Sequence, residues 1–408
     1  MKHFSIRDSY STKNERKHHS SSNAGSRLFV TKFILGCILV SLGIFISGTG
    51  GSWDITNHLL NKPENFFSAP HAMLYTGVAS AMVGCAVMLR AHKSMQSFYQ
   101  SLGTSSTKLV IAGIAMLLIA GPVDFAWHSA FGLDGLLSPP HFVLLMGMVI
   151  SSLGSLFGII LCTNRDKLND SSDLENVSRY RPSRTSCSSL FMRPYIAMIL
   201  IIIGIMPIWL SLEGVIGMFS LPFSKTQFFD FNPDPSFAAV LATLSYPFLL
   251  SLILISSFII GKNSFGIISV TGSIYVAVSV LTVIIPNESL IVTLPFYILN
   301  LIPIIVVDVL LSVSKHRFPY YISLGGAILG STFFMMHYPL ITHIYNEVVT
   351  KQAFVWPSLT SSIYFGMIGS IYPLLVVPGV AMGITGAIAA NKIIAHRIQW
   401  HNKEQRVS

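Results

Sequence analysis

Two segments of the chain carry the same three titratable residues at the same spacing, Asp-x3-His-x12-His. The residues are Asp54, His58 and His71 in the first segment, and Asp124, His128 and His141 in the second. With 13 His in 408 residues, one such pattern is expected only about 0.01 times by chance. Two copies that align 70 residues apart without a gap therefore indicate that these positions share a chemical task.

One aspartate and two histidines are well suited to binding a transition metal. The Asp and the first His are four residues apart, so their side chains lie on one face of a helix. The second His follows a proline, Pro70 or Pro140, where a new helix is expected to begin. A hairpin between the helices would gather a ligand set that fits copper, zinc or non-heme iron, with one coordination position left open. The alternative interpretation is that these groups pair with one another, cap helix ends or face interfacial water.

The similarity between the two segments extends beyond the triads. The further matching residues are Gly51, Ser68, Pro70, Leu74 and Gly77, which correspond to Gly121, Ser138, Pro140, Leu144 and Gly147. Glu64 corresponds to Asp134, so an acidic group is retained as well. We therefore expect a parallel internal repeat of a two-helix unit, with both triads on the same side of a membrane.

The composition indicates that membrane helices position these residues. Hydrophobic residues make up 52% of the chain and charged residues 11%, whereas soluble domains carry about 25% charged residues. Open strands would leave backbone groups unsatisfied in lipid, so we expect an all-α, polytopic helical bundle. Ten apolar stretches are predicted to span the bilayer, at 29–49, 70–90, 108–128, 139–162, 194–220, 236–260, 264–285, 289–313, 318–342 and 363–390.

The positions of Lys and Arg predict how this bundle is oriented. With both termini placed in the cytoplasm, only Lys62, Lys225 and Lys351 of the 26 Lys and Arg residues fall in outer loops. This asymmetry is the positive-inside pattern of a plasma-membrane protein, and it accounts for the net charge of +9 without a nucleic-acid partner. Both triads are then expected on the outer side, in contact with the lipid bilayer's outer leaflet or interface.

Changes in polarity along the chain predict five regions. They are a disordered basic tail at 1–28, a four-helix repeat unit at 29–162, a cytoplasmic linker at 163–193, a six-helix membrane domain at 194–398 and a short cytoplasmic tail at 399–408. The first tail has no apolar run and is therefore not a cleavable signal peptide. The four cysteines have no metal-site spacing and lie outside the predicted outer loops, so they indicate neither a thiolate site nor a disulfide framework.

Five other polar residues are predicted at the depth of the triads. They are Glu64, Asp134, Glu213, His337 and His343. They are candidates for additional ligands, for groups that orient the ligands through hydrogen bonds, or for a proton path. The alternative is that they are interfacial anchors paired with local groups. Asp308 is predicted near the inner end of its span, with a role in helix packing or gating.

At these residues the chain resembles the C subunit of the particulate methane and ammonia monooxygenases, which has a membrane-embedded Asp-x3-His-x12-His copper site. Within the intervening segment that family has an acidic residue, then Ser or Thr and Pro, and here Asp134, Ser138 and Pro139 take those places. The first copy has Glu64, Phe67 and Ser68, but Ala69 instead of the proline. The family's Arg before the acidic residue is replaced by Leu133 and Pro63, and the family subunit has fewer spans and one motif.

The resemblance implies copper at the two triads, with zinc or iron as alternatives, and a component of a monooxygenase-like oxidoreductase. An equally possible role is that of a subunit that scaffolds a larger membrane complex or a homo-oligomer. A metal-ion or small-solute permease is the competing class, because the same ligands could load a cation before transport. A structural membrane subunit without metal is the third.

Overall fold

Helices form every regular element in the part of the chain that the structure describes. The structure is a computed structural model that describes residues 8–59, 67–92, 97–131, 137–163, 194–220, 233–261, 263–284, 286, 291, 294–313, 318–333 and 372–407. The elements are α1 (Asp8–Leu59), α2 (Ala69–His92), α3 (Ser97–Phe131), α4 (Pro139–Thr163), α7 (Pro194–Ser220), α8 (Pro235–Ile260), α9 (Ile267–Ile284), α10 (Leu294–Leu299), α11 (Leu301–Val313), α12 (Phe318–Ile328), the π-helical turn η2 (Leu329–Phe333) and α15 (Tyr372–Val407).

Seven helices among the described residues are long and apolar enough to cross a membrane. They are Thr31–Asn57, Ala69–His92, Gly103–Phe131, Pro139–Thr163, Tyr195–Ser220, Val240–Ile260 and Val376–Ile394. Two shorter apolar helices are Ile267–Thr282 and Tyr297–Val313. The predicted helical bundle of membrane-spanning type is therefore confirmed, with seven full-length candidate spans in these ranges. The predicted stretches at 318–342 and 363–390 lie partly outside the described residues.

The prediction of a disordered tail at 1–28 differs from the structure, in which α1 is helical from Asp8 onward. The chain has no proline before Pro63, so nothing interrupts the hydrogen-bond ladder on the N-terminal side of the first span. Once a helix is nucleated, each added residue gains one hydrogen bond. The helix α15 likewise continues to Val407, through most of the segment predicted as a short C-terminal tail at 399–408.

Within the apolar stretch predicted at 289–313, α10 ends at Leu299 and α11 begins at Leu301. Asn300 lies between them, and its N–H donates to the carbonyl of Tyr297 (3.1 Å) in a tighter turn. Pro303 explains the break, since a proline has no N–H to offer the carbonyl four residues earlier and its ring collides with that carbonyl.

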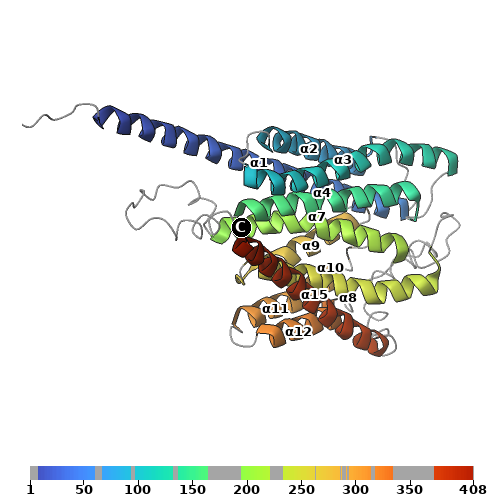
Figure 1. The fold of residues 1–408 in the computed structure, drawn as a ribbon. Coiled ribbons are helices and arrows are strands. Elements are labelled where there is room, and N and C mark those ends of the chain that lie inside the picture. Colours follow the sequence, from blue (N-terminus) through green and yellow to red (C-terminus); the bar gives the residue numbers. More distant parts are fainter. Residues whose placement is uncertain are drawn as a thin grey trace, which may run out of the picture.

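The first four helices form two neighbouring antiparallel pairs, α1 with α2 and α3 with α4 (Figure 1). A Cβ atom added at Gly77 would lie 2.5 Å from the carbonyl oxygen of Gly43 on α1. A Cβ at Gly147 would lie 2.8 Å from the carbonyl oxygen of Gly113 on α3. The second pair of glycines lies 70 positions after the first, so corresponding positions make both helix crossings.

Replacing Gly77 with alanine is expected to destabilise the protein by about 1–3 kcal/mol, because the added methyl meets backbone atoms that cannot move aside. Gly121→Ala is the matched control, since a Cβ there meets nothing within 4 Å. Thermal unfolding of the detergent-solubilised protein measures both. Equal midpoints for the two variants would contradict the close approach at the crossing.

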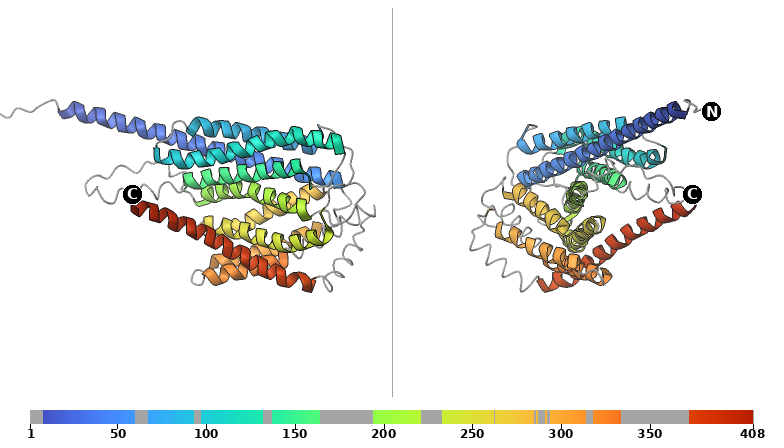
Figure 2. Two further views of the ribbon diagram at one scale, coloured as in Figure 1. Left: turned by 45° about the vertical axis from the view of Figure 1, so that its right-hand side comes forward. Right: turned by 90° about the vertical axis from the view of Figure 1, so that its left-hand side faces the viewer.

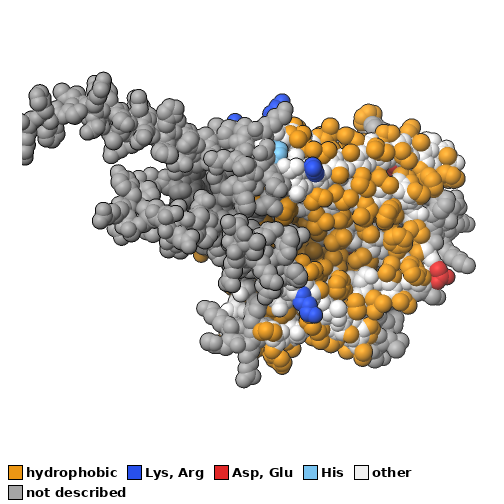
Figure 3. All heavy atoms as spheres, in the orientation of Figure 1, with side chains coloured by type: hydrophobic (Ala, Val, Ile, Leu, Met, Phe, Trp, Pro, Cys, Tyr) orange, Lys and Arg blue, Asp and Glu red, His pale blue; other side chains and the backbone are white. Residues whose placement is uncertain are grey.

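Two hydrophobic cores hold the described helices together. One holds α1, α2, α3 and α4 together around fully buried residues such as Phe33, Val40 and Met148. The other joins α7, α8, α9, α11, α12 and α15 around Leu254, Phe258 and neighbouring residues. In Figure 2, α7 is the member of the second group that lies next to the first group, between α4 and α8. Apolar side chains cover most of the described surface in Figure 3, as expected for a surface that contacts lipid.

The two ends of the described chain lie at the same end of the bundle (Figure 1). The C-terminal ends of α1 and α3 and the N-terminal ends of α2 and α4 lie at the opposite end. The triad residues belong to these helix ends, so the fold brings the two repeated segments to one end of the molecule.

Candidate metal centre

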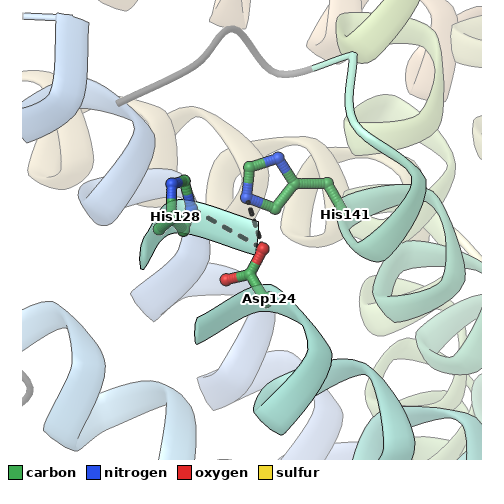
Figure 4. A group of neighbouring side chains, drawn as sticks. All are labelled: Asp124, His128 and His141. Carbon is green, nitrogen blue, oxygen red and sulfur yellow. Dashed lines mark ion pairs between the residues drawn. The ribbon is translucent and has the colours of Figure 1, made fainter. Parts of the chain in front are cut away.

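The end of α3 and the start of α4 bring one complete triad together. Asp124 and His128 lie one turn apart near the C-terminal end of α3, and His141 lies in the first turn of α4. Figure 4 shows both imidazoles directed toward the carboxylate of Asp124. Asp124 Oδ1 is 3.2 Å from His141 Nε2 and 3.6 Å from His128 Nε2. The Asp-x3-His-x12-His spacing therefore brings the three side chains together, as predicted.

The separations between these donor atoms fit a bound metal ion. One potential ligand atom from each of the three residues lies within 4.8 Å of the others. Ligands about 2.0–2.1 Å from a tetrahedral metal lie about 3.3 Å apart. The two carboxylate–imidazole distances lie close to that value, and the two rings, 5.5 Å apart at their centroids and tilted by 52°, face a shared space.

The carboxylate oxygen at the centre of the triad has no hydrogen bond in the described part of the chain. Asp124 Oδ1 is buried, and neither imidazole donates to it although His141 Nε2 lies within hydrogen-bonding distance. A buried acceptor without a donor is costly. A cation that accepts a lone pair from this oxygen and one from each ring would satisfy the buried carboxylate oxygen, so the residues present fit a metal.

A serine cap fixes the direction in which His141 enters the site. The N–H of His141 donates to Ser138 Oγ (3.4 Å), and the N–H of Phe142 donates to the Ser138 carbonyl (3.1 Å). Ser138 is therefore the N-cap and Pro139 the first helical residue, so Pro140 is second rather than first as predicted. Proline is tolerated at both positions because their N–H groups have no partner within the helix.

The first triad is only partly within the described residues. His71 Nε2 lies 2.9 Å from Asp54 Oδ1, which corresponds to the contact between His141 and Asp124. His58 belongs to α1, but its side chain lies outside the described part. The side chains of Asp54 and His71 are 19% and 23% exposed, and those of the second triad 21–25% exposed. The two places thus have similar access to solvent.

The two sites are neighbours at the end of the bundle. Tyr75, one turn after His71 on α2, stacks on that imidazole with 6.1 Å between ring centroids. The charges of both Asp54 and Asp124 act on the Tyr75 hydroxyl. Tyr75 thus lies within electrostatic reach of both carboxylates, a position that the sequence pattern did not reveal because it depends on how α2 packs beside α3.

Of the five additional candidate residues, only Glu213 lies within the described part of the chain. Glu213 accepts a hydrogen bond from the hydroxyl of Tyr275, a residue of α9 that belongs to neither triad. Glu64, Asp134, His337 and His343 lie outside the described residues. Asp308, predicted as a packing or gating residue, is fully buried, and its Oδ2 accepts hydrogen bonds from the Ser269 N–H (2.9 Å) and hydroxyl (2.6 Å) at the start of α9.

Comparison of the chain with models of protein families, with curated proteins and with solved structures gave no match. Any functional conclusion therefore has to be argued from the geometry of the site.

Proposed function

We propose that this protein is an integral membrane metalloprotein that binds copper through Asp124, His128 and His141. The observation that carries the proposal is the convergence of one carboxylate and two imidazoles within 4.8 Å. These ligands come from two helices that pack through a glycine crossing, so the bundle itself holds them in place. Asp54 and His71, with His58, are proposed as a second site of the same kind.

Copper is preferred because two imidazoles and a carboxylate suit Cu(II), and because the Asp-x3-His-x12-His pattern resembles a copper motif. Zinc and iron share these ligands and are distinguished by metal analysis of the purified protein. That analysis, with all six triad positions substituted as the control, is the experiment that tests the proposal. Loss of metal only in the substituted protein would support it, and an equal metal content in both would contradict it.

The proposed role of the site is that of an oxidoreductase component related to membrane monooxygenases. Bound copper would supply one-electron redox chemistry. The protein's own contribution would be to hold two imidazoles and one carboxylate with a position left open, and to limit water, since all three side chains are about three-quarters buried. Partner membrane subunits or a homo-oligomer would complete such an enzyme.

A permease is the second candidate, and two observations favour it. Glu213 and Asp308 are carboxylates within the apolar helices α7 and α11, which carry no residue of either triad. Ionisable residues among membrane helices commonly mark ion pathways. Uptake of copper or zinc into liposomes that contain the protein would distinguish the two candidates, because a redox subunit would leave the internal metal concentration unchanged.

We further propose that the protein lies in the plasma membrane, and that its bundle has ten spans with both termini in the cytoplasm. An even number of spans is supported by the position of both chain ends at one end of the bundle. The internal repeat of α1–α2 and α3–α4 is supported by glycine crossings and by Asp–His contacts that correspond at 70 residues.

Reporter fusions test this topology. A reporter fused after residue 175 is expected to be active in the cytoplasm, and one fused after residue 228 is expected to be active outside it. The reason is the bias of Lys and Arg toward the predicted cytoplasmic loops. The reverse pattern at either position would overturn the proposed orientation.

A further inference from the structure

A carboxylate on α7 and a phenol on α9 form a pair between two helices that carry no ligand of the proposed metal centre. The hydroxyl of Tyr275 on α9 donates to Glu213 Oε1 on α7. The Tyr275 side chain is only 3% exposed. Its ring stacks on Trp209, one turn before Glu213 on the same helix, with 4.0 Å between centroids and 3° between planes. One helix therefore holds both the ring and the hydroxyl of Tyr275.

The groups around this pair do not include a cation among the described residues. Glu213 forms no ion pair there with Lys, Arg or His, and its contact with Tyr275 is a hydrogen bond. Tyr246 of α8 is a further titratable side chain on a neighbouring helix, and its hydroxyl lies 3.4 Å from Ser220 Oγ. A negative charge on Glu213 would thus have no compensating positive charge in this part of the structure.

The ligand that best fits this pair is a proton. A charged carboxylate among membrane helices is costly without a partner. A metal cation such as calcium requires about 6–8 oxygen ligands, and the described residues offer one carboxylate and one phenol. A single proton on Glu213 removes the charge, and the remaining carbonyl oxygen still accepts the hydrogen bond from Tyr275.

Hydroxyl groups line one face of α9 on both sides of Tyr275. Those of Ser279 and Thr282, which donate to carbonyls of their own helix, lie between Tyr275 and the end of the bundle that carries the triads. Thr271, Tyr275, Ser279 and Thr282 follow one another at intervals of three or four residues, so they lie on one face of the helix. Thr282 Oγ1 accepts a hydrogen bond from Ser52 Oγ of α1 (3.3 Å), two residues before Asp54. We call these four residues the α9 hydroxyl row.

We propose that Glu213 and Tyr275 form a proton-binding site inside the bundle, and that the α9 hydroxyl row carries proton exchange between this site and the triad end. When the proton leaves, Glu213 becomes a carboxylate and water at that end receives the proton. The inference goes beyond the proposed metal centre and does not depend on it, because the site and the row are complete in the metal-free chain.

Infrared difference spectroscopy of the full, metal-free protein in lipid nanodiscs tests the site. We expect a carbonyl-stretch band of a protonated carboxylic acid that Glu213→Gln removes and that Asp308→Asn, a matched change at another carboxylate within the apolar helices, leaves in place. Tyr275→Phe is expected to shift the band to higher wavenumber, because the carbonyl loses its hydrogen bond. A spectrum in which neither Glu213→Gln nor Tyr275→Phe alters a carboxylic-acid band across the accessible pH range would overturn the proposal.

The rate at which this band shifts after transfer to heavy water tests the path. Ser279→Ala and Thr282→Val are expected to slow the exchange about tenfold, the factor that corresponds to raising a barrier by the net worth of one hydrogen bond. Ser273→Ala is the matched control, because Ser273 lies on the opposite, exposed face of α9. Equal rates in all three variants and the wild type would overturn the assigned path.

Discussion

Alanine at His141 is expected to remove about one equivalent of copper from the purified protein. A site with three protein ligands loses most of its affinity when one is removed, and the remaining carboxylate and imidazole are then ordinary weak ligands. His128→Ala should have the same effect, since His128 Nε2 and His141 Nε2 both approach Asp124 Oδ1. Metal analysis after desalting, at equal protein concentration, measures the loss.

His92→Ala is the control for this experiment. His92 lies at the other end of α2, where its Nε2 is 3.0 Å from Thr104 Oγ1. It shares the residue type and the helical setting but takes no part in either triad, so its removal should leave the metal content unchanged. An unchanged metal content in His128→Ala, His141→Ala and the double variant would exclude the second triad as a metal site.

The triad was predictable because its geometry is local. Asp124 and His128 need only a helix to share a face, and His141 needs only a short hairpin and a helix start marked by Ser138 and proline. The apolar stretches likewise predicted the helical bundle, because lipid permits few other structures. A repeat with conserved spacing strengthened both inferences, since the same local rule applies twice.

Other features depended on contacts between distant helices and were not predictable in the same way. Glu213 was assigned to the depth of the triads, yet it bonds to Tyr275, which lies 62 residues later in the chain. The position of Tyr75 near both Asp54 and Asp124 likewise follows from helix packing. The break at Asn300 was a local matter that the apolar composition concealed, because Pro303 weakens a helix without changing its hydropathy.

The two triads are expected to hold metal unequally, with the second the tighter site. Ser138 Oγ caps the helix that carries His141, whereas Ser68 Oγ, the corresponding atom, has no hydrogen bond in the described residues. A ligand whose backbone is fixed loses less freedom when it binds metal. If Lys108 and Lys32 both mark the inner face, as the sequence predicts, helix rise also puts Asp124 about 24 Å and Asp54 about 33 Å from that face.

Asp124→Asn should therefore reduce metal retention more than Asp54→Asn. Neutralising Asp124 removes the one negative charge that faces both imidazoles of the described triad, so we expect an affinity loss larger than the roughly 10–100-fold that follows loss of an outer hydrogen-bond partner. At Asp54 the same change is expected to release a metal that exchanges more readily in the wild type. Titration with a graded series of chelators, followed by metal analysis, resolves the two release steps.

The outcome of that titration also distinguishes two separate sites from one shared site. Two independent sites predict two release steps in the wild type, with the weaker step lost in Asp54→Asn and the stronger in Asp124→Asn. Equal loss in both variants, or earlier release from the second triad in the wild type, would contradict the ranking. Equal loss would instead favour a single ion shared by the two repeats.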